Sequence, residues 1–472
     1  MIHIDSTLRM DSLQKELGDL FSCGTRATTS LRSNWDPSRG TPVFTVDGLY
    51  TSRGWTEWTQ GFVFGNAIYL FDATGDTQML NYARTGTLQT MATHITHTGV
   101  HDHGFNNAST YGNLLRLMEE GRLPENEWED RFLRLALRVS GAVQATRWTE
   151  LRDDLGYVYS FNGPHSLFSD TIRSMRVLAL SHALGHTLMG EQDRKISLLR
   201  RLLQHAETTA RYNVYFGTGR DIYDIRGRVA HESIFNITNG AYRCPSTQQG
   251  YSPYSTWTRG LAWILCGYAE ELEYLRKVGD REVRELELPY FPSLAEIERR
   301  FLETACAVAD FYIENTPADG VPYWDTGAPG LIHMGDYLDR PSDPFNQYEP
   351  VDSSAAAIAA QGLLRLGAYM GSRTGQADRA AARYLSAGLT VAKSIFSDPY
   401  LSREERHQGI LLHSVYHRPN GWDHIPEGRH VAAGESCMWG DYHALELGVY
   451  LQRLAGNGPY LTFFGGIGKS EY

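Results

Sequence analysis

The chain has 472 residues, of which 42% are hydrophobic and 21% charged, and its formal net charge is −11. These fractions are typical of a soluble globular protein and exclude the disordered and fibrous classes. The negative charge argues against a broad nucleic-acid surface, which needs a basic stripe. No apolar run approaches 18 residues, so the sequence predicts no membrane-spanning helix.

The start of the sequence and its cysteines indicate a reducing compartment. Residues 1–21 lack the basic start and the apolar stretch of a signal peptide. The five cysteines have neither the spacing of a metal site nor the even number of a disulfide framework. We therefore expect a cytoplasmic protein, or a periplasmic one if a signal peptide has been removed. We also expect a monomer or homodimer without nucleic-acid or membrane partners.

Apolar residues recur with the period of an amphipathic helix in eleven segments, and residues 10–21 could form a twelfth. The eleven segments are residues 56–74, 76–95, 107–121, 128–148, 169–185, 193–212, 254–278, 293–316, 352–371, 378–396 and 440–455.

The helical segments come in pairs joined by short turns that contain glycine, which makes neighbouring helices antiparallel. One member of a pair is apolar almost all round, as in AAAIAAQGLL, and the other carries more charge, as in DRKISLLRRLL. Inner helices covered on all sides and outer helices covered on one side produce this difference. The sequence therefore predicts an all-α, (α/α)6 barrel of six helical hairpins. We expect one catalytic domain over residues 1–472, with residues 1 to about 50 in part an extension packed on the barrel.

Four longer stretches, residues 22–54, 212–256, 320–350 and 400–438, are predicted to be non-helical loops at the mouth of the barrel. The second and third contain pieces that resemble strands. Long loops in a compact domain are usually functional or disordered.

Two aspartates lie at predicted helix starts and are candidates for acid–base chemistry. Asp102 stands in VHDHGFNNAS and Asp170 in FSDTIRSMRVLAL. Each could instead cap its helix. Two carboxylates on opposite sides of a sugar are the usual requirement of glycoside hydrolysis, and a carboxyl that donates a proton at neutral pH needs a raised pKa.

A third motif, TQQGYSPYSTWTRGLAW, places Arg259 between Trp257 and Trp263. A buried arginine suits a planar carboxylate, which a guanidinium can bind with two parallel hydrogen bonds. Alternatively, this arginine stacks on aromatic rings and binds backbone carbonyls. Aromatic residues beside Asp, Ser or Gly recur near other helix starts, at residues 54–62, 321–329, 349–360, 411–419 and 436–446. These motifs would converge on one carbohydrate site if the helix starts share a face, although each could also belong to the core.

Together, HDHGF, SDTIRSM, QGYSPYSTWTRGLAW, VPYWDTGAP, DSSAAAIAAQGLL and MWGDYHALE resemble the unsaturated glucuronyl hydrolases, glycoside hydrolase family 88, from about Trp55 to about Leu451. The resemblance implies the same (α/α)6 barrel. It also implies release of the unsaturated uronic acid from the non-reducing end of oligosaccharides that polysaccharide lyases produce. Neither a metal ion nor an organic cofactor is implied.

The resemblance also implies roles for individual residues. Asp170 is the general acid and base, and Asp102 contacts the sugar hydroxyls and supports the acid. Asp170 would protonate C4 of the C4=C5 double bond, and a water deprotonated by the same Asp170 would add at C5. The implied substrate-binding residues are His231, Gln249, Trp257, Arg259, Trp263, Trp58, Trp148 and Tyr416.

Three other functions remain open at this point. Asp102 and Asp170 could divide the acid and base roles in a hydrolase of intact β-glucuronides. An α/α-barrel sugar epimerase would use paired histidines, and the late loops contain His413, His417, His424 and His430. A non-catalytic sugar-binding protein is the last alternative.

Overall fold

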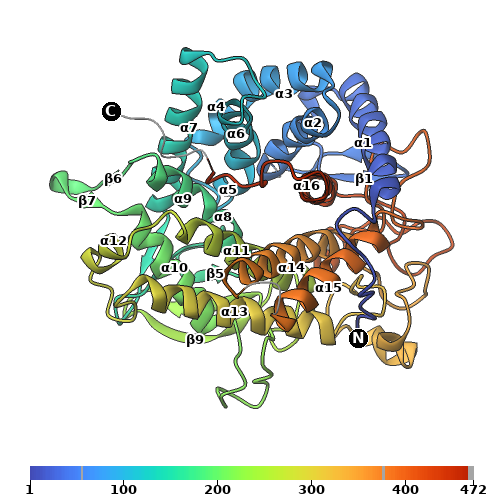
Figure 1. The fold of residues 1–472 in the computed structure, drawn as a ribbon. Coiled ribbons are helices and arrows are strands. Elements are labelled where there is room, and N and C mark those ends of the chain that lie inside the picture. Colours follow the sequence, from blue (N-terminus) through green and yellow to red (C-terminus); the bar gives the residue numbers. More distant parts are fainter. Residues whose placement is uncertain (55–56, 375–377, 466–472) are drawn as a thin grey trace.

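The computed structural model describes residues 1–54, 57–374 and 378–465 (Figure 1). Trp55, where the family resemblance begins, and Thr56, where the first of the eleven helices was predicted to start, lie outside the described residues. The α-helices are α1 (Gln14–Asn34), α2 (Gln60–Thr74), α3 (Thr77–Thr90), α4 (Ala92–Ile95), α5 (His103–Asn107), α6 (Asn113–Glu119), α7 (Glu127–Thr146), α8 (Thr171–Ser174), α9 (Arg176–Ala183), α10 (Leu198–Tyr212), α11 (Thr258–Leu275), α12 (Asp280–Glu285), α13 (Leu294–Glu314), α14 (Ser353–Thr374), α15 (Arg379–Ile395) and α16 (Met438–Ala455). The strands are β1 (Phe44–Val46), β2 (Leu49–Thr51), β3 (Trp148–Glu150), β4 (Gly156–Val158), β5 (Ser166–Phe168), β6 (Leu188–Met189), β7 (Lys195–Ile196), β8 (Glu232–Asn236) and β9 (Ala241–Ser246).

The helices form two concentric layers, and the inner layer closes on itself. Going round the ring, α2 packs on α5, α5 on α8 and α9, these on α11, α11 on α14, α14 on α16, and α16 again on α2. Outside them, α3 packs on α2, α7 on α9, α10 on α9, α13 on α11, α15 on α14, and α1 on α16. The predicted (α/α)6 barrel is therefore confirmed.

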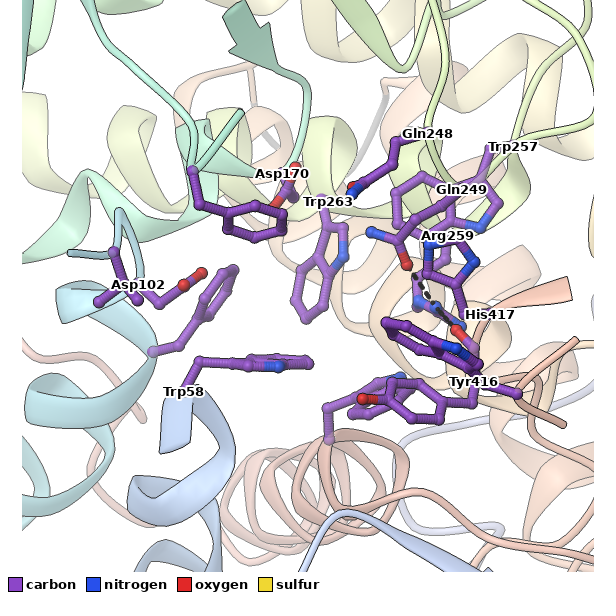
Figure 2. A pocket seen from close by; sticks show the side chains of 15 residues that line it. Trp58, Asp102, Asp170, Gln248, Gln249, Trp257, Arg259, Trp263, Tyr416 and His417 are labelled. Atoms are coloured by element: carbon purple, nitrogen blue, oxygen red, sulfur yellow. Dashed lines mark hydrogen bonds between the residues drawn. The ribbon is translucent and has the colours of Figure 1, made fainter. Parts of the chain in front are cut away.

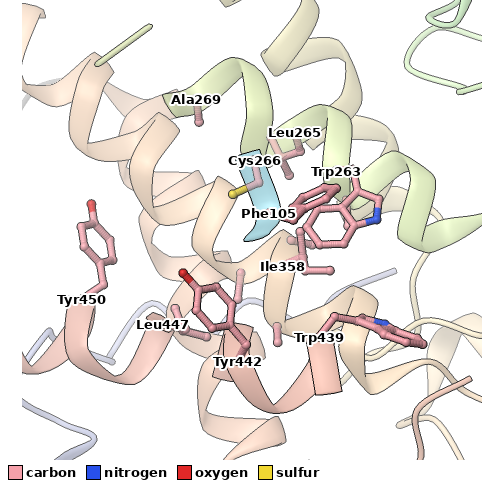
Figure 3. Packing of buried hydrophobic residues seen from close by; sticks show 14 of the residues in the cluster. Phe105, Trp263, Leu265, Cys266, Ala269, Ile358, Trp439, Tyr442, Leu447 and Tyr450 are labelled. Carbon is pink, nitrogen blue, oxygen red and sulfur yellow. The ribbon is translucent and has the colours of Figure 1, made fainter. Parts of the chain in front are cut away.

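The core lies where the inner helices meet (Figure 3). Leu265 and Cys266 of α11 and Leu447 of α16 are fully buried in the cluster that Figure 3 draws, as is Ile358. A side chain at Gly362 of α14 would lie 2.7 Å from Leu265 and 2.9 Å from the backbone nitrogen of Cys266. Close contact between α11 and α14 therefore requires glycine at this position.

The prediction that residues 22–54 are non-helical is wrong for their first part, because α1 continues to Asn34. Thr and Ser are frequent in this segment and have weak helix propensity. The buried side chains of this part, which include Cys23, Ala27 and Leu31, nevertheless lie along one face of α1, and α1 packs on α16 and α2. Burial of that face outweighs the local preference.

Short strands occupy the connecting loops rather than the barrel. β8 and β9 confirm the strand-like pieces predicted in residues 212–256, and they extend a three-stranded antiparallel sheet from β5. Residues 320–350, all of them described, form 3-10 turns and isolated bridges instead of strands. Within the described ranges, every helix is too short or too polar to cross a membrane.

Candidate active site

A pocket of about 740 Å³, its open mouth included, lies at the end of the barrel where the inner helices begin (Figure 2). Figure 2 shows Asp102 and Trp58 on one side of the pocket, Gln249, Arg259 and Tyr416 on the other, and Trp263 between them. The lining residues are Trp58, Val100, Asp102, Phe105, Phe161, Asp170, Gln248, Gln249, Trp257, Arg259, Trp263, Tyr416, His417, Trp422 and Trp439.

Helix starts bring these residues together from distant parts of the chain. Asp102, Asp170 and Trp257 are the residues immediately before α5, α8 and α11. Trp439 lies in the first turn of α16. Neither aspartate side chain caps its helix. The capping alternative therefore does not describe them, and both carboxylates are left for the pocket.

One buried histidine connects the two aspartates. The Nε2 atom of His101 lies 3.2 Å from Oδ2 of Asp170 and 3.7 Å from Oδ1 of Asp102. Single oxygens of the two carboxylates and a ring nitrogen of His101 all lie within 4.8 Å of one another. The carboxylates thus share one side of the pocket and one proton donor.

The three groups titrate as a unit. Burial lowers the pKa of His101, but the charges of Asp102 and Asp170 outweigh burial and raise this pKa above its ordinary value. Burial raises the pKa of Asp102, and the charge of Asp170 adds to that rise. Burial also raises the pKa of Asp170, but the hydrogen bond and charge of His101 outweigh it and bring this pKa below its ordinary value. These opposite shifts favour an imidazolium at His101 paired with a carboxylate at Asp170.

The terminal N–H groups of Arg259 already have hydrogen-bond partners within the protein. Its Nη1 donates to Asp352 at 2.7 Å and to the carbonyl of Val415, and its Nη2 donates to the carbonyl of Tyr416 at 2.9 Å and to Oε1 of Gln249 at 3.2 Å. The guanidinium also stacks on two tryptophans, Trp257 and Trp439. These four hydrogen bonds take up its terminal N–H groups. In the unbound protein the structure therefore shows the alternative of stacking and backbone carbonyls, together with the ion pair to Asp352. That Arg259 binds a substrate carboxylate stays a prediction.

Arg259 instead fixes its neighbours. Because the Oε1 atom of Gln249 accepts from Arg259, the amide nitrogen of Gln249 remains as a donor for the pocket. His231 lies one layer behind the lining. Its ring packs on Trp257, and its Nδ1 accepts from the backbone N–H of Gln248 at 3.0 Å. Burial lowers the pKa of His231 to about 4, so it is neutral and orders residues 248–249.

We expect the conservative change Arg259→Lys to raise KM at least tenfold and to lower the melting temperature. A lysine has no planar fork, so it cannot bind Asp352, Gln249 and the two carbonyls together. Steady-state kinetics and thermal unfolding measure the two effects. Arg201→Lys is the control, because Arg201 stacks on Trp148 outside the pocket. An unchanged KM in Arg259→Lys would contradict this role.

Aromatic rings form most of the remaining wall. Trp58, in the 3-10 turn Glu57–Thr59, stacks on Trp439 with ring centroids 5.1 Å apart. Trp263 packs on Phe105 at 4.8 Å. Apolar C–H faces of a sugar suit such rings. Contrary to the prediction that Trp148 binds the substrate, this residue does not line the pocket. It lines a separate depression beside α10, where Arg201 lies 4.7 Å from its ring.

Trp58→Ala is expected to raise KM about tenfold, because a large apolar contact to the sugar is lost. Trp148→Ala serves as the matched control and should leave KM within about twofold of wild type, since that ring lies outside the pocket. Steady-state kinetics on one substrate compares the two variants. Equal effects on KM would mean that the pocket is not the sugar site.

Several lining residues were not singled out from the sequence. Trp439 stands in a motif that was noted only as an aromatic cluster, and His417 was considered only for an epimerase, whereas Phe161 and Trp422 had no distinct signal. Of the four loop histidines considered for an epimerase, His417 lines the pocket. His413 instead packs on Phe345 and Tyr400.

Among the residues that the structure describes, two groups of side chains bring potential metal-ligand atoms within 4.8 Å of one another. One is the cluster of His101 and the two aspartates, in which the ring nitrogen that faces both carboxylates is used in the hydrogen bond to Asp170. We interpret it as a proton-sharing cluster. The other is Asp47, His424 and Glu435, where Glu435 already accepts from Thr45 and Gly48. That no metal ion or cofactor is needed stays a prediction.

No family model matches the chain. Among curated proteins, it is 27% identical over 408 residues to the unsaturated glucuronyl hydrolase of Bacillus sp. strain GL1, a match that covers 84% of this chain and 87% of that protein. It is 24% identical over 397 residues to the protein of the same name from Formosa agariphila, covering 83% and 78% of the two chains.

Solved structures agree with this likeness in fold. An unsaturated glucuronyl hydrolase described as specific for heparin matches with a TM-score of 0.69 at 20% identity, over 94% of this chain and 98% of that one. The Bacillus sp. GL1 enzyme matches with a TM-score of 0.65 at 24% identity, over 93% and 96% of the two chains. The resemblance that the sequence motifs predict is thus confirmed: this chain is related to the unsaturated glucuronyl hydrolases over most of its length and has their fold.

Proposed function

We propose that the protein is a glycoside hydrolase that releases the unsaturated uronic acid from the non-reducing end of lyase-generated oligosaccharides. The observation that carries this proposal is the shared position of Asp102 and Asp170, which both lie within 3.7 Å of the same nitrogen of His101. The likeness to proteins named unsaturated glucuronyl hydrolases supports the same substrate class.

The shared position argues against hydrolysis of intact glucuronides. That reaction needs carboxylates on opposite sides of the scissile bond, either to hold a water or to form a covalent intermediate. Here single oxygens of the two carboxylates lie within 4.8 Å of each other beside one imidazole nitrogen, which places both carboxylates on the same side of the pocket. Protonation of an alkene requires one acid on one face, which this cluster supplies.

The proposed reaction adds water across the C4=C5 bond. Asp170 protonates C4, and the positive charge that develops at C5 is shared with the ring oxygen. The Asp170 carboxylate then removes a proton from a water that adds at C5. The resulting hemiketal opens, and the aglycone leaves. Positioned acid–base groups of this kind typically contribute about 10²–10⁴-fold in rate.

Around this centre, the other pocket residues would bind and orient the sugar. The amide nitrogen of Gln249 is a donor for the uronate, and Trp58 and Trp263 provide apolar faces. Arg259 holds Gln249 and the backbone at Val415 and Tyr416 in place, and Asp352 balances its charge.

The test uses the near-ultraviolet absorbance of the conjugated double bond. Wild-type protein is incubated with a panel of lyase-generated disaccharides and, separately, with intact glucuronides. Loss of absorbance is the expected result. Release of glucuronic acid from an intact glucuronide, without loss of absorbance in the panel, would replace the proposal with the saturated alternative. Interconversion of free sugars would indicate an epimerase.

A further inference from the structure

The acid in the proposed reaction has to acquire a proton before each turnover. Asp170 must be protonated when it meets the alkene, yet it is ionised in the free protein because His101 holds its pKa low despite burial. Within the described ranges, the one side chain that hydrogen-bonds to the Asp170 carboxyl is His101. The immediate proton source is therefore this imidazole.

His101 has the surroundings of a group that holds a positive charge in the interior. Its side chain is fully buried between the rings of Phe161 and Phe168. A buried cation is costly unless it is paired, and Asp102 and Asp170 provide two carboxylates for one imidazolium. Its Nδ1 atom has no hydrogen-bond partner among the described residues, so Nε2 is the nitrogen through which the proton moves.

The other charged or titratable groups near His101 do not compete for this proton. Burial lowers the pKa of His205 to about 3 and that of His231 to about 4, so both rings are neutral. Arg147 is positively charged, but it donates to the backbone carbonyls of Thr98 and Ser160. The exchange is therefore confined to His101 and its two carboxylates.

We propose that His101 is a positioning residue that stores the catalytic proton and passes it to Asp170 when an anionic uronate binds. This inference rests on the proposed function. The substrate carboxylate adds a negative charge to a pocket from which water is displaced, and a second charge on Asp170 becomes unfavourable there. The proton then moves from Nε2 to Oδ2 along the 3.2 Å hydrogen bond, which leaves a neutral imidazole and a neutral carboxylic acid.

The proton count balances over one turnover. Asp170 gives its proton to C4 and becomes a carboxylate, and the proton of the attacking water returns to it. When the product leaves, the pocket loses the substrate charge, and the proton moves back to Nε2. His101 never contacts the substrate and acts only through Asp170.

His101→Gln tests the inference because the glutamine amide keeps a hydrogen-bond donor near the position of Nε2 but cannot store a proton. In the wild type, activity is lost at high pH when the cluster loses its proton, above the ordinary imidazole pKa of about 6.5. In His101→Gln only carboxyls hold the proton, so the basic limb of the kcat/KM profile should move down by at least about one pH unit. We expect about a 100-fold loss at pH 8 and less than about a tenfold loss at pH 5.

The control is His205→Asn, which keeps an acceptor for the backbone N–H of Val158 and removes another fully buried histidine. It should leave the basic limb where it is. A purely structural role of His101 would lower kcat/KM by the same factor at every pH. That outcome would overturn the proposal.

Imidazole ¹⁵N spectra of the free protein give a readout that does not need turnover. The signals lost in His101→Gln identify His101, and we expect them to show an imidazolium at pH 6.5 that becomes neutral when a non-hydrolysed uronate analogue binds. A neutral ring in the free protein would overturn the inference. If wild-type protein fails to consume any unsaturated disaccharide, the proposed function fails, and the free-protein spectra still decide whether His101 holds the proton.

Discussion

Asp170→Asn is expected to lower kcat on an unsaturated disaccharide by about 10³-fold while KM stays within about threefold of wild type. The amide has nearly the same size as the carboxyl and can still accept the hydrogen bond from His101, but it can neither deliver a proton to C4 nor deprotonate water. Both proton transfers of the proposed reaction pass through this one group. The expected loss lies within the range for a positioned general acid–base catalyst.

The decrease of the near-ultraviolet absorbance measures kcat for this variant. Asp154→Asn is the matched control, because Asp154 binds Arg200 outside the pocket and should keep wild-type kinetics. Thermal unfolding of both variants shows whether the barrel is intact. More than a tenth of wild-type kcat in a folded Asp170→Asn protein would show that another residue is the acid.

Glu446→Gln should lower the free energy of unfolding by about 3 kcal/mol at neutral pH. Glu446 of α16 is fully buried and lies 3.0 Å from Arg173 of α8 and 3.6 Å from Arg176 of α9. Tyr69 of α2 donates to it at 2.9 Å. The glutamine removes the negative charge and leaves two arginines in the barrel interior with less compensation.

The same residue predicts a specific dependence of stability on pH. Burial raises the pKa of Glu446, but the charges of Arg173 and Arg176 outweigh burial and lower it from the ordinary 4.5 to about 2. The group is ionised more readily in the folded than in the unfolded protein. Its contribution is therefore complete above about pH 4.5 and is lost as the pH falls towards 2.

Urea unfolding of wild type and Glu446→Gln at pH 7 and at pH 3 measures this contribution. The difference between the two proteins should shrink at the lower pH. Glu303→Gln is the control, because Glu303 forms exposed ion pairs with Arg299 and Arg300 and should change stability by less than about 0.5 kcal/mol. A difference that stays constant from pH 7 to pH 3 would contradict the assignment.

The helical architecture could be predicted because the buried faces of helices require apolar residues that recur with the helical period. α14 is apolar almost all round and lies in the inner ring, whereas α10 has one apolar face and lies outside. The length of α1 could not be predicted, because one of the surfaces that covers its apolar face is α16, which lies more than 400 residues further along the chain. Local composition rich in Ser and Thr favoured a loop there.

The predicted site residues divide in the same way. Asp102, Asp170 and Trp257 stand at the starts of inner helices, which share one end of an (α/α)6 barrel. Their meeting therefore follows from the fold. Trp148 lies at the first position of β3, and the pairing of that strand with β4 turns its ring towards α10. The spacing of the motifs does not predict which way a side chain points when it lies in a short strand within a loop.

The hydrogen-bond partners of Arg259 could not be predicted from the sequence either. The residue type and its aromatic neighbours fitted two arrangements, and only the position of Asp352 and of the carbonyls at 415–416 decides between them. Those groups follow Arg259 by about 90 to 160 residues in the chain. The role of His101 depends in the same way on the distance between two carboxylates from different hairpins.

The hydrogen bonds of Arg259 also have a consequence for biosynthesis. They join segments around residues 249, 352 and 416, and Trp439 stacks on the same guanidinium. During translation the five hairpins that end with α15 leave the ribosome before the segment that completes this cluster. A nascent chain that ends before residue 415 contains Gln249 and Asp352 but lacks the two carbonyls and Trp439 that complete the cluster. It also exposes apolar surface of inner helices, which makes such intermediates prone to aggregation.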